Sequence, residues 1–325
     1  MRIALLYGGQ SGEHDVSLRS AASIIDHLDP QAYKITEILI GRDGQWHVDG
    51  QAVSLPTALG VIREHDLAFP ALHGPYGEDG RVQAMLEWVG VPYIGNGVFA
   101  SAAGMDKAVT KKLLAADGLR VAPGVTIDGA SPDPLVRGLG LPLFVKPARA
   151  GSSLGVSKVD DLSDLPAALS AARAFDHKIL VESAVIGREV DVAVLQHPDG
   201  QVEAGPPLEI SVPSGFFDFA AKYEGGAAFE IPAQLDPAVT AVVQDRAIRA
   251  FHALGCRALL RVDFFLPSPG HPSPGWFGDP DEPVINEVNT FPGMTAESQL
   301  PQIWRQAGLE FPALLDILIA GATRL

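Results

Sequence analysis

The sequence has little cysteine, little basic charge and no long apolar run. Its 325 residues include one cysteine, Cys256, which excludes an intrachain disulfide framework and favours a reducing compartment. With 24 basic and 39 acidic residues the formal net charge is −15, which argues against broad nucleic-acid binding because that requires a basic surface. No apolar run reaches the roughly 18 residues that span a bilayer. The N-terminus turns into Gly8 and Gly9 too early for a secretory signal, so we expect a cytoplasmic protein without a membrane partner.

The rest of the composition is that of a folded globular protein. Hydrophobic residues make up 47% and charged residues 19%, and the length is sufficient for two or three modules with their own cores. Cys256 is best explained as a small buried side chain near a helix end. Because the overall charge is acidic, an anionic ligand would depend on local lysine and arginine side chains.

The first hundred residues alternate short apolar strands with amphipathic helical patterns. The expected strands are residues 3–7, 35–40, 67–72 and 92–94, and the expected helices are 16–28 and 82–89. This βαβ order predicts an α/β domain over residues 1–100, with a parallel sheet wrapped by helices. Ligands of such sheets bind beyond the carboxyl ends of the strands, where the polar loops 8–17 and 73–80 lie.

The remainder of the chain predicts an α+β arrangement with antiparallel sheets. A second module begins near residue 101, and strands dominate from residue 190 onward. Residues 266–283 are rich in proline, glycine and serine and are most simply an exposed hairpin insertion. The expected strands are 121–127, 143–145 and 178–182, and the expected helices are 105–116, 165–174 and 237–254.

Two strand-like runs near the C-terminus carry alternating polar side chains. Arg261 and Asp263 share one strand face, and Glu287 and Asn289 share another, because residues two apart in a strand point the same way. If the strands pair, two carboxylates, an amide oxygen and a guanidinium converge. Such oxygen ligands suit Mg²⁺, which also binds nucleotide phosphates. The pattern therefore predicts a metal–nucleotide site.

A glycine- and serine-rich loop follows the strand that delivers Lys146. Residues 146–155 read Lys-Pro-Ala-Arg-Ala-Gly-Ser-Ser-Leu-Gly, and glycines and serine hydroxyls suit a loop around phosphate oxygens. The loop lacks the Gly-Lys-Ser/Thr ending of a Walker A motif. Alone it is as compatible with a plain turn, but beside the metal strands a phosphate loop is favoured. Lys107, in the first turn of a helix, can also reach an α-phosphate, although an isolated lysine there is more simply a surface residue.

Three further regions leave alternatives open. Glu182 and Glu189 can accept hydrogen bonds from adenine and ribose, but ordinary exposed glutamates are the simpler interpretation. Glu13, where loop 8–17 meets a helix, either caps the helix and helps to compensate its dipole or binds a substrate ammonium group. His73 is equally compatible with a ligand contact and a structural role.

The segments 73–80 and 215–224 complete the candidate regions. Glu78 and Asp79 are interpreted as caps of the helix that begins near residue 81. Residues 215–224 combine three phenylalanines with Lys222 and Tyr223, a composition typical of a lid that closes over a site and expels water. An interface patch or core aromatics under a loop is the alternative.

Taken together, these motifs resemble the D-alanine–D-alanine ligase family of ATP-grasp enzymes from bacterial cell-wall synthesis. The resemblance runs from Gly8 to Pro301, nearly the whole chain, with six motifs in order. Residues 13–17 read Glu-His-Asp-Val-Ser, residues 73–80 His-Gly-Pro-Tyr-Gly-Glu-Asp-Gly, and residues 105–107 Met-Asp-Lys. The phosphate loop, a Lys-Tyr pair in the lid and residues 286–295, Asn-Glu-Val-Asn-Thr-Phe-Pro-Gly-Met-Thr, complete the set.

The resemblance implies a fold and a nucleotide site. The fold is a Rossmann-like N-terminal substrate domain followed by a two-lobed ATP-grasp module, with lobes at 101–185 and 186–325. ATP then lies between the lobes, with its phosphates on lysines, its adenine and ribose near glutamates, and two Mg²⁺ ions (Mn²⁺ is possible) beside them. The implied nucleotide contacts are Lys107, Lys146, Ser153, Glu182, Glu189 and Lys222, and the implied metal ligands are Asp263, Glu287 and Asn289.

The resemblance also implies ligation of two D-alanines through an acyl phosphate. Glu13 binds the first ammonium group and is positioned by Ser152 and Tyr223, and Arg261 with the Gly293 N–H forms an oxyanion hole. Substrate contacts are implied for His73, Ser298 and Gln299. The absence of a nucleophilic triad agrees, because phosphoryl transfer needs positioning and charge neutralisation. A homodimer is expected from the family.

Tyr223 favours an amino-acid nucleophile, because depsipeptide-forming relatives tend to carry phenylalanine there. A D-alanine–D-lactate or D-alanine–D-serine ligase is the alternative enzyme, and a non-catalytic nucleotide-binding module the alternative class. Ala150 replaces an acidic residue that is common before the glycine–serine turn, and Phe217 and Phe219 replace frequent tyrosines. These departures bear on loop ordering and lid contacts.

Overall fold

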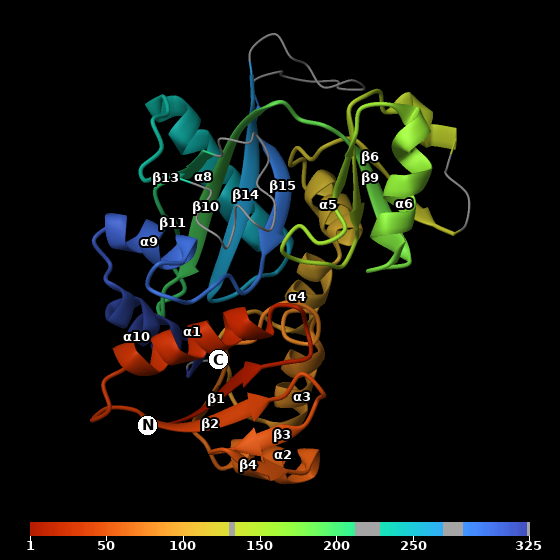
Figure 1. The fold of residues 1–325 in the computed structure, drawn as a ribbon. Coiled ribbons are helices and arrows are strands. Elements are labelled where there is room, and N and C mark those ends of the chain that lie inside the picture. The colour runs from red at the N-terminus through yellow and green to blue at the C-terminus, as the bar shows by residue number, and fades with distance from the viewer. Residues whose placement is uncertain (130–133, 212–227, 269–281, 324–325) are drawn as a thin grey trace.

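The structure is a computed structural model that describes residues 1–129, 134–211, 228–268 and 282–323. Three sheets divide the chain into an N-terminal, a central and a C-terminal part (Figure 1). In the described part of the chain, none of the helices is long and apolar enough to cross a membrane.

The N-terminal part is built on a five-stranded sheet in the order β4-β3-β2-β1-β5. Strand β1 (Arg2–Gly8) lies parallel to both β2 (Lys34–Ile40) and β5 (Leu67–Pro70). Side chains of β1 alternate between two cores, because neighbouring residues in a strand point to opposite faces. Leu5 packs with helix α1 (His14–His27), whereas Leu6 packs with helices α2 (Leu55–Arg63) and α3 (Arg81–Val89). The predicted α/β fold of this part is confirmed, and loops 8–17 and 73–80 follow β1 and β5.

Three details of this domain differ from the sequence prediction. Strands β3 (Trp46–Val48) and β4 (Gln51–Val53) extend the sheet in antiparallel fashion, so the sheet is mixed and not wholly parallel. Neither these strands nor α2 was predicted. For the two strands the reason is their length, because three residues are too few to reveal a period of two. The strand expected at residues 92–94 is wrong: Tyr93 forms only an isolated bridge with Ala68.

The central part is a four-stranded antiparallel sheet in the order β6-β9-β7-β8. Its strands are β6 (Gly124–Asp128), β7 (Leu143–Pro147), β8 (Ser157–Val159) and β9 (Lys178–Ser183), and α6 (Leu165–Arg173) packs against it. Short 3₁₀ helices occur at Pro134–Gly138 and Leu162–Asp164. The predicted strand at 121–127 begins three residues later, at Gly124, and Val121 contributes only an isolated bridge to Ile285.

Two helices lead into this sheet. The helix predicted over 105–116 is divided at Asp106, which ends α4 (Val98–Met105) and caps α5 (Lys107–Ala116) by accepting from the Val109 N–H. The Asp106 carboxylate also pairs with Lys178 of β9, at 2.8 Å. This cap fixes the start of α5 against the central sheet, and with it the position of Lys107.

The C-terminal part is a six-stranded sheet in the order β13-β12-β10-β14-β15, with β11 beside β10. Helix α8 (Pro237–Ala253) covers one face, and the buried Cys256 follows that helix, as predicted. Burial raises the pKa of its thiol to about 12, so the thiol stays protonated. The strands are β10 (Gly187–Gln196), β11 (Val202–Ala204), β12 (Leu208–Ser211), β13 (Ala228–Glu230), β14 (Leu259–Pro267) and β15 (Val284–Asn289).

Strands β14 and β15 pair as the sequence predicted. They run antiparallel, with Arg261 opposite Asn289 and Asp263 opposite Glu287. The next pair is Phe264 with Ile285, so Asn286 is an extra residue on β15 and forms a β-bulge. The bulge interrupts the alternation of side chains at Asn286 and Glu287. The segment between the strands is the predicted insertion, and its residues 269–281 lie outside the described residues.

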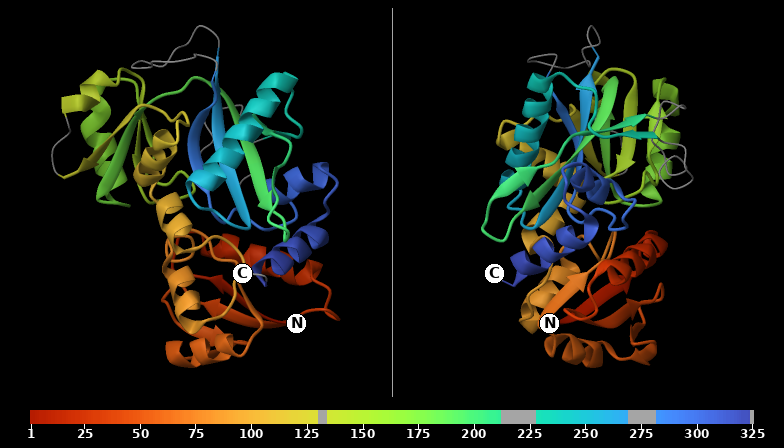
Figure 2. Two further views of the ribbon diagram at one scale, coloured as in Figure 1. Left: turned by 180° about the vertical axis from the view of Figure 1, so that it is seen from behind. Right: turned by 90° about the vertical axis from the view of Figure 1, so that its left-hand side faces the viewer.

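The last two helices return to the N-terminal domain. Helices α9 (Gln299–Gln306) and α10 (Phe311–Ala322) lie between α1 and the C-terminal sheet in both rear and side views (Figure 2). Trp304 and Leu314 share a buried core with Ile24 of α1 and Leu195 of β10. The N-terminal domain and the C-terminal lobe are therefore joined by a continuous apolar core.

Candidate active site

Two adjoining cavities lie where the three parts meet. One, of about 430 Å³, is lined by loops of the N-terminal domain and by β14, β15 and the segment after β15. The other, of about 620 Å³, lies between the central and C-terminal sheets. Lys107, Ala150, Gly151 and Glu287 line both. We name them, after the ligands that the family resemblance implies, the amino-acid cavity and the nucleotide cavity. Except for Asp263, all candidate residues within the described part of the chain line one or both.

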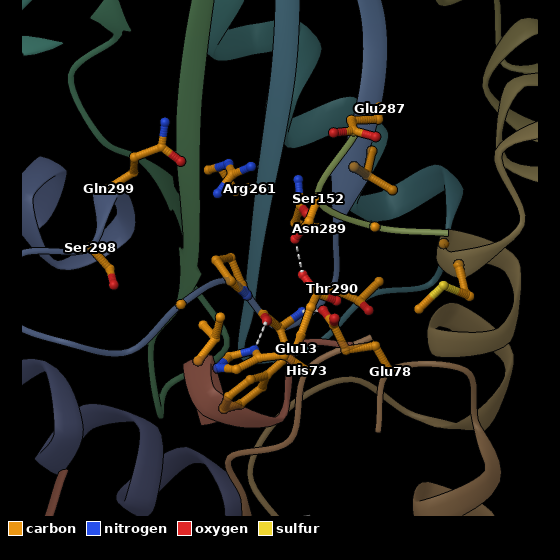
Figure 3. Close-up of a pocket in the computed structure, with 18 of the residues that line it drawn as sticks. Glu13, His73, Glu78, Ser152, Arg261, Glu287, Asn289, Thr290, Ser298 and Gln299 are labelled. Atoms are coloured by element: carbon orange, nitrogen blue, oxygen red, sulfur yellow. Dashed lines mark hydrogen bonds between the residues drawn. The ribbon is translucent and has the colours of Figure 1, made fainter. Parts of the chain in front are cut away.

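Glu13 and Ser152 meet in the amino-acid cavity. The Ser152 hydroxyl donates to Glu13 Oε1 at 2.6 Å, a contact the resemblance implied (Figure 3). Glu13 occupies the N-cap position of α1, but its side chain makes no capping hydrogen bond, so the capping interpretation is wrong. Loop 8–17 instead turns the carboxylate toward the cavity. Asp15, two residues on, faces solvent and pairs with Arg42 at 2.7 Å.

Glycines make room for the Glu13 carboxylate. A Cβ atom at Gly151 would lie 2.8 Å from Glu13 Oε2, and one at Gly74 would also collide with that oxygen. Gly74 has a φ of +72°, a conformation that L side chains rarely adopt. The phosphate loop and loop 73–80 therefore approach Glu13 from two sides, and both need glycine there.

His73, which is buried, and Glu78, which is half-buried, both line the same cavity. His73 shares hydrogen bonds with the Ser20 hydroxyl at 2.8 Å and the Phe291 carbonyl at 3.2 Å, so it has a structural role as well as a place in the lining. Burial lowers the pKa of its imidazole, against the attraction of Glu13. The ring is therefore neutral near pH 7.

Glu78 does not cap the helix at residue 81, contrary to the prediction. Its carboxylate accepts from the Gly74 N–H at 2.6 Å and the Phe291 N–H at 3.1 Å, so it ties loop 73–80 to the segment after β15. Burial, followed by repulsion from Glu13, raises the pKa of Glu78 to about 8. Asp79, in contrast, accepts from the Arg81 N–H at 3.2 Å, as expected of a cap.

Arg261 lies at the centre of a buried charge cluster. Its Nε and Nη2 atoms donate to the two Asp263 oxygens at 2.7 and 2.8 Å, and Nε lies 3.4 Å from Asp191 Oδ2. Burial opposes the charged form, but Asp263 and then Asp191 outweigh it and hold the pKa of Arg261 above its usual range. The guanidinium therefore stays charged and points into the amino-acid cavity (Figure 3).

The proposed metal ligands lie close together and are already paired with protein cations. Asp263 also accepts from the Asn289 amide at 3.0 Å, and Glu287 Oε2 lies 3.1 Å from Lys107 Nζ. Among the residues described, no group of three or more histidine, cysteine, aspartate or glutamate side chains is arranged to hold a metal. Glu287 and Asn289 line the amino-acid cavity, and together with the buried Asp263 carboxylate opposite Glu287 they nevertheless fit Mg²⁺ in donor chemistry.

Lysines line the nucleotide cavity, as predicted. Lys107 has a side chain only 14% exposed and donates to the Ala150 carbonyl at 2.8 Å, so it is not a surface lysine. Burial opposes its charge, but Glu287 outweighs that effect and raises its pKa. Lys146 is buried and pairs with Glu182, which is itself 3% exposed. The interpretation of Glu182 as an exposed glutamate is therefore wrong.

Apolar side chains make up part of the lining of the nucleotide cavity. Its walls include Phe144, Ile186, Ile210 and Phe265, and Ser153 and Glu189 also line it. Ser152 and Ser153 adopt left-handed backbone conformations, with φ of +53° and +57°, which turn the phosphate loop between the two cavities.

Asn286 is a lining residue that the sequence prediction missed. Because it is the extra residue of the bulge, Asn286 and its neighbour Glu287 both line the nucleotide cavity. Its Oδ1 atom lies 3.3 Å from Lys146 Nζ. Strict alternation would have placed it on the opposite face from Glu287, so only knowledge of the register could have revealed it.

Gly293, Ser298 and Gln299 also line the amino-acid cavity, and Ser298 and Gln299 lie to one side of Glu13 (Figure 3). The Thr295 N–H donates to the Ser298 hydroxyl at 3.2 Å, and Gln299 donates to Asp191 at 2.9 Å. A Cβ atom at Gly293 would lie 2.9 Å from the Ser298 hydroxyl. Lys222, Tyr223 and the remainder of the proposed lid lie outside the described residues.

Substitution of Gly151 tests the close packing of the phosphate loop against Glu13. We expect Gly151→Ala to lower the kcat/KM of the reaction on the order of 100-fold, because a small displacement of a positioning group has effects of that size. The matched control is Gly60→Ala in α2, where an added Cβ meets no atom within 4 Å. Steady-state kinetics and thermal unfolding of both variants check this. Wild-type kinetics in Gly151→Ala would contradict it.

The fold and the paired cavities define the class of the protein. A nucleotide-sized cavity between two antiparallel sheets, lined by buried lysines and adjoining a Rossmann-like domain, is the arrangement of an ATP-grasp enzyme. Residues 125–320 match the family described as D-ala D-ala ligase C-terminus, and residues 2–58 and 54–96 match D-ala D-ala ligase N-terminus.

Curated and solved relatives agree with this match. The chain is 43% identical to the D-alanine–D-alanine ligase of Mycolicibacterium smegmatis, over 98% of this chain and 94% of the relative. It is 46% identical to that of Corynebacterium aurimucosum, over 99% and 97%. The chain therefore belongs to the D-alanine–D-alanine ligase family.

Solved structures show the same fold. The VanG D-Ala:D-Ser ligase of Enterococcus faecalis superposes with a TM-score of 0.84 at 33% identity, covering 99% of both chains. The D-alanine–D-alanine ligase of Bacillus anthracis complexed with ATP has a TM-score of 0.82 at 28% identity, covering 100% of this chain and 98% of that one.

Proposed function

We propose that this protein joins two D-alanines at the expense of ATP, through an acyl phosphate, to give the D-alanyl-D-alanine used in peptidoglycan precursors. The observation that carries the proposal is the adjoining pair of cavities. Glu13 stands in one, Lys146 stands in the other, and the phosphate loop lies between them. Full-length family membership supports the same reaction.

The nucleotide cavity suits ATP along its length. We assign its apolar lining residues to the adenine ring and Glu189 to the ribose hydroxyls. Lys107, Lys146 and Ser153 are placed for the phosphates. Lys107 lines both cavities, so we assign it to the phosphate nearest the amino acid. Because Glu182 holds Lys146 in the described structure, we assign Glu182 first to orienting that lysine, in addition to the adenine contact that the resemblance implies.

The amino-acid cavity suits two zwitterions placed end to end. Glu13, held by Ser152, binds the ammonium group of the first D-alanine, and His73 supports that subsite. Ser298 and Gln299 lie to one side of Glu13, where they receive the carboxylate of the second D-alanine (Figure 3). Arg261 also lines the cavity and, with the Gly293 N–H, stabilises the negative charge that develops on the attacked carbonyl oxygen.

Mg²⁺ fits at Asp263, Glu287 and Asn289, where it would neutralise phosphate charge during transfer. Residues of the chain bind and position the two substrates during phosphoryl transfer and peptide-bond formation. The first carboxylate attacks the γ-phosphate and ADP leaves, so that an acyl phosphate forms while Glu13 keeps the ammonium group in place. The ammonium group of the second D-alanine loses a proton to solvent, and the resulting amine attacks the activated carbonyl. Arg261 and Gly293 stabilise the tetrahedral oxyanion until phosphate departs. The family resemblance assigns Lys222 to the γ-phosphate and Tyr223 to the positioning of Glu13.

An ADP-release assay across D-alanine, D-serine and D-lactate tests the proposal. We expect release with D-alanine alone, product identified as the dipeptide, and no release when EDTA removes Mg²⁺. Preferred use of D-lactate or D-serine as the second substrate would favour the alternative, a D-alanine–D-lactate or D-alanine–D-serine ligase. The structural similarity to a D-Ala:D-Ser ligase is the reason for testing this alternative. ATP binding without D-alanine-dependent ADP release would instead leave a nucleotide-binding module.

We also propose domain boundaries, an oligomeric state and a cellular location. We assign residues 1–100 to the substrate domain, 101–185 to the central lobe and 186–325 to the C-terminal lobe, because each sheet then lies within one domain. We propose a cytoplasmic homodimer, on the grounds of family resemblance and the single buried cysteine. Sedimentation velocity measures the assembly.

A further inference from the structure

Lys111 is a buried cation behind the nucleotide cavity. It lies on α5 one turn after Lys107, and residues four apart share a helix face. The residue is 7% exposed, and it stands apart from the described residues that line the cavity. Its Nζ atom pairs with Oε1 of Glu182. Burying a charged ammonium group costs free energy, so the position of Lys111 in the interior calls for an explanation.

Glu182 is shared between two lysines. Oε1 pairs with Lys111 from helix α5, and Oε2 pairs with Lys146 from strand β7. Lys146 lies at the cavity surface, where its Nζ also lies 3.3 Å from Asn286. Lys111, in contrast, is not among the described residues that line the cavity. The three charges sum to one positive charge, which faces the position proposed for the phosphates.

We propose that Lys111 is a positioning residue for the nucleotide, an inference that rests on the proposed function. Lys111 remains the counter-ion of Glu182, and Lys146 is therefore able to turn from Glu182 to a phosphate. A buried carboxylate that loses its only cation is strongly destabilised. If Lys111 were absent, movement of Lys146 toward ATP would leave Glu182 unpaired. With Lys111 present, Glu182 keeps one partner throughout.

The charges around Lys111 give the proposal a dependence on pH. Glu182 of β9 faces it directly, and Lys146 of β7, Glu287 of β15 and Lys107 of its own helix lie nearby. Burial lowers the pKa of Lys111 to about 8, even though Glu182 opposes that change. Below pH 8 Lys111 is charged and can neutralise Glu182. Above pH 8 it loses its proton, and Glu182 then depends on Lys146 alone.

Direct measurement of nucleotide binding tests this role. We expect Lys111→Met to raise the dissociation constant of AMP-PNP with Mg²⁺ by roughly 10- to 100-fold at pH 7.5, the range of one buried charge interaction. The KM for D-alanine at saturating ATP stays near its wild-type value. Lys111→Arg retains the charge at higher pH, so its affinity holds between pH 8 and 9.5 where the wild-type affinity falls.

Two controls separate positioning from general damage. Lys112, the next residue, is exposed, and Lys112→Met should bind AMP-PNP as the wild type does. In a Glu182→Gln background there is no carboxylate to neutralise, so adding Lys111→Met should change the dissociation constant less than about threefold. Thermal unfolding without nucleotide reports on folding. If Lys111→Met does not fold, the pH profile of Lys111→Arg decides alone.

The results of these experiments also separate the positioning role of Lys111 from the proposed joining of two D-alanines. An unchanged dissociation constant in Lys111→Met, or an equal loss in the Glu182→Gln background, would overturn the positioning role. So would a pH profile of Lys111→Arg identical to that of the wild type. A wild-type protein that fails to join D-alanines, while Lys111→Met still weakens nucleotide binding as described, would refute the proposed reaction and leave the role of Lys111 intact.

Discussion

Glu13→Gln is expected to lower kcat/KM for the first D-alanine by on the order of 10² to 10³, because it removes one charge from a partly buried ion pair. The shape of the side chain is preserved, so loops 73–80 and 146–155 can still close around it. Glu13 lines the amino-acid cavity only, and the affinity for AMP-PNP should stay within a factor of three. Steady-state kinetics and isothermal titration calorimetry measure the two quantities.

Asp15→Asn is the matched control for this substitution. Asp15 lies on the same helical turn, but it is exposed and paired with Arg42, so we expect unaltered kinetics. Ser152→Ala should fall between the two, with a loss of roughly 10- to 100-fold, the range of a hydrogen bond to a charged group. Equal kinetics for Glu13→Gln and Asp15→Asn would refute the assignment of Glu13 to the ammonium group.

Arg261→Met is expected to reduce both turnover and stability. Loss of an oxyanion donor lowers kcat by on the order of 10² to 10³. Loss of the cation also leaves Asp263 and Asp191 buried without their shared partner, which costs about 3 to 5 kcal/mol of unfolding free energy. Urea unfolding followed by circular dichroism gives the second quantity.

Arg261→Lys separates the two effects. A lysine restores the positive charge beside Asp263, so much of the lost stability should return. It cannot reproduce the two-atom geometry of the guanidinium, so kcat should remain low. The surface control is Arg249→Lys, which contacts Asp117 far from both cavities. Recovery of wild-type kcat in Arg261→Lys would contradict the oxyanion role.

The strand pattern predicted the centre of the site well. Polar residues two apart in two runs placed Arg261, Asp263, Glu287 and Asn289 together, and the β14–β15 register confirms it. Alternation is a local property of strands, so it survives in a single sequence. The family resemblance supplied what alternation could not, because Glu13 and Ser152 are 139 residues apart and meet only through the fold.

What the sequence failed to reveal depends on register, burial or very short elements. The bulge at Asn286 changes which residues face the cavity, and no local pattern marks it. Lys111 resembles any lysine on an amphipathic helix until Glu182 is placed beside it. Glu78 looks like a helix cap in sequence, but its partner Phe291 lies 213 residues away.

Transfer of oxygen from substrate to phosphate tests the central claim most directly. If the carboxylate of the first D-alanine attacks ATP, the oxygen that bridges to phosphorus leaves with phosphate when the amine attacks. With D-alanine labelled with ¹⁸O in its carboxyl group, mass spectrometry should therefore find one ¹⁸O in each phosphate released, in step with dipeptide formation. Phosphate without ¹⁸O, or ADP release without dipeptide, would contradict the account.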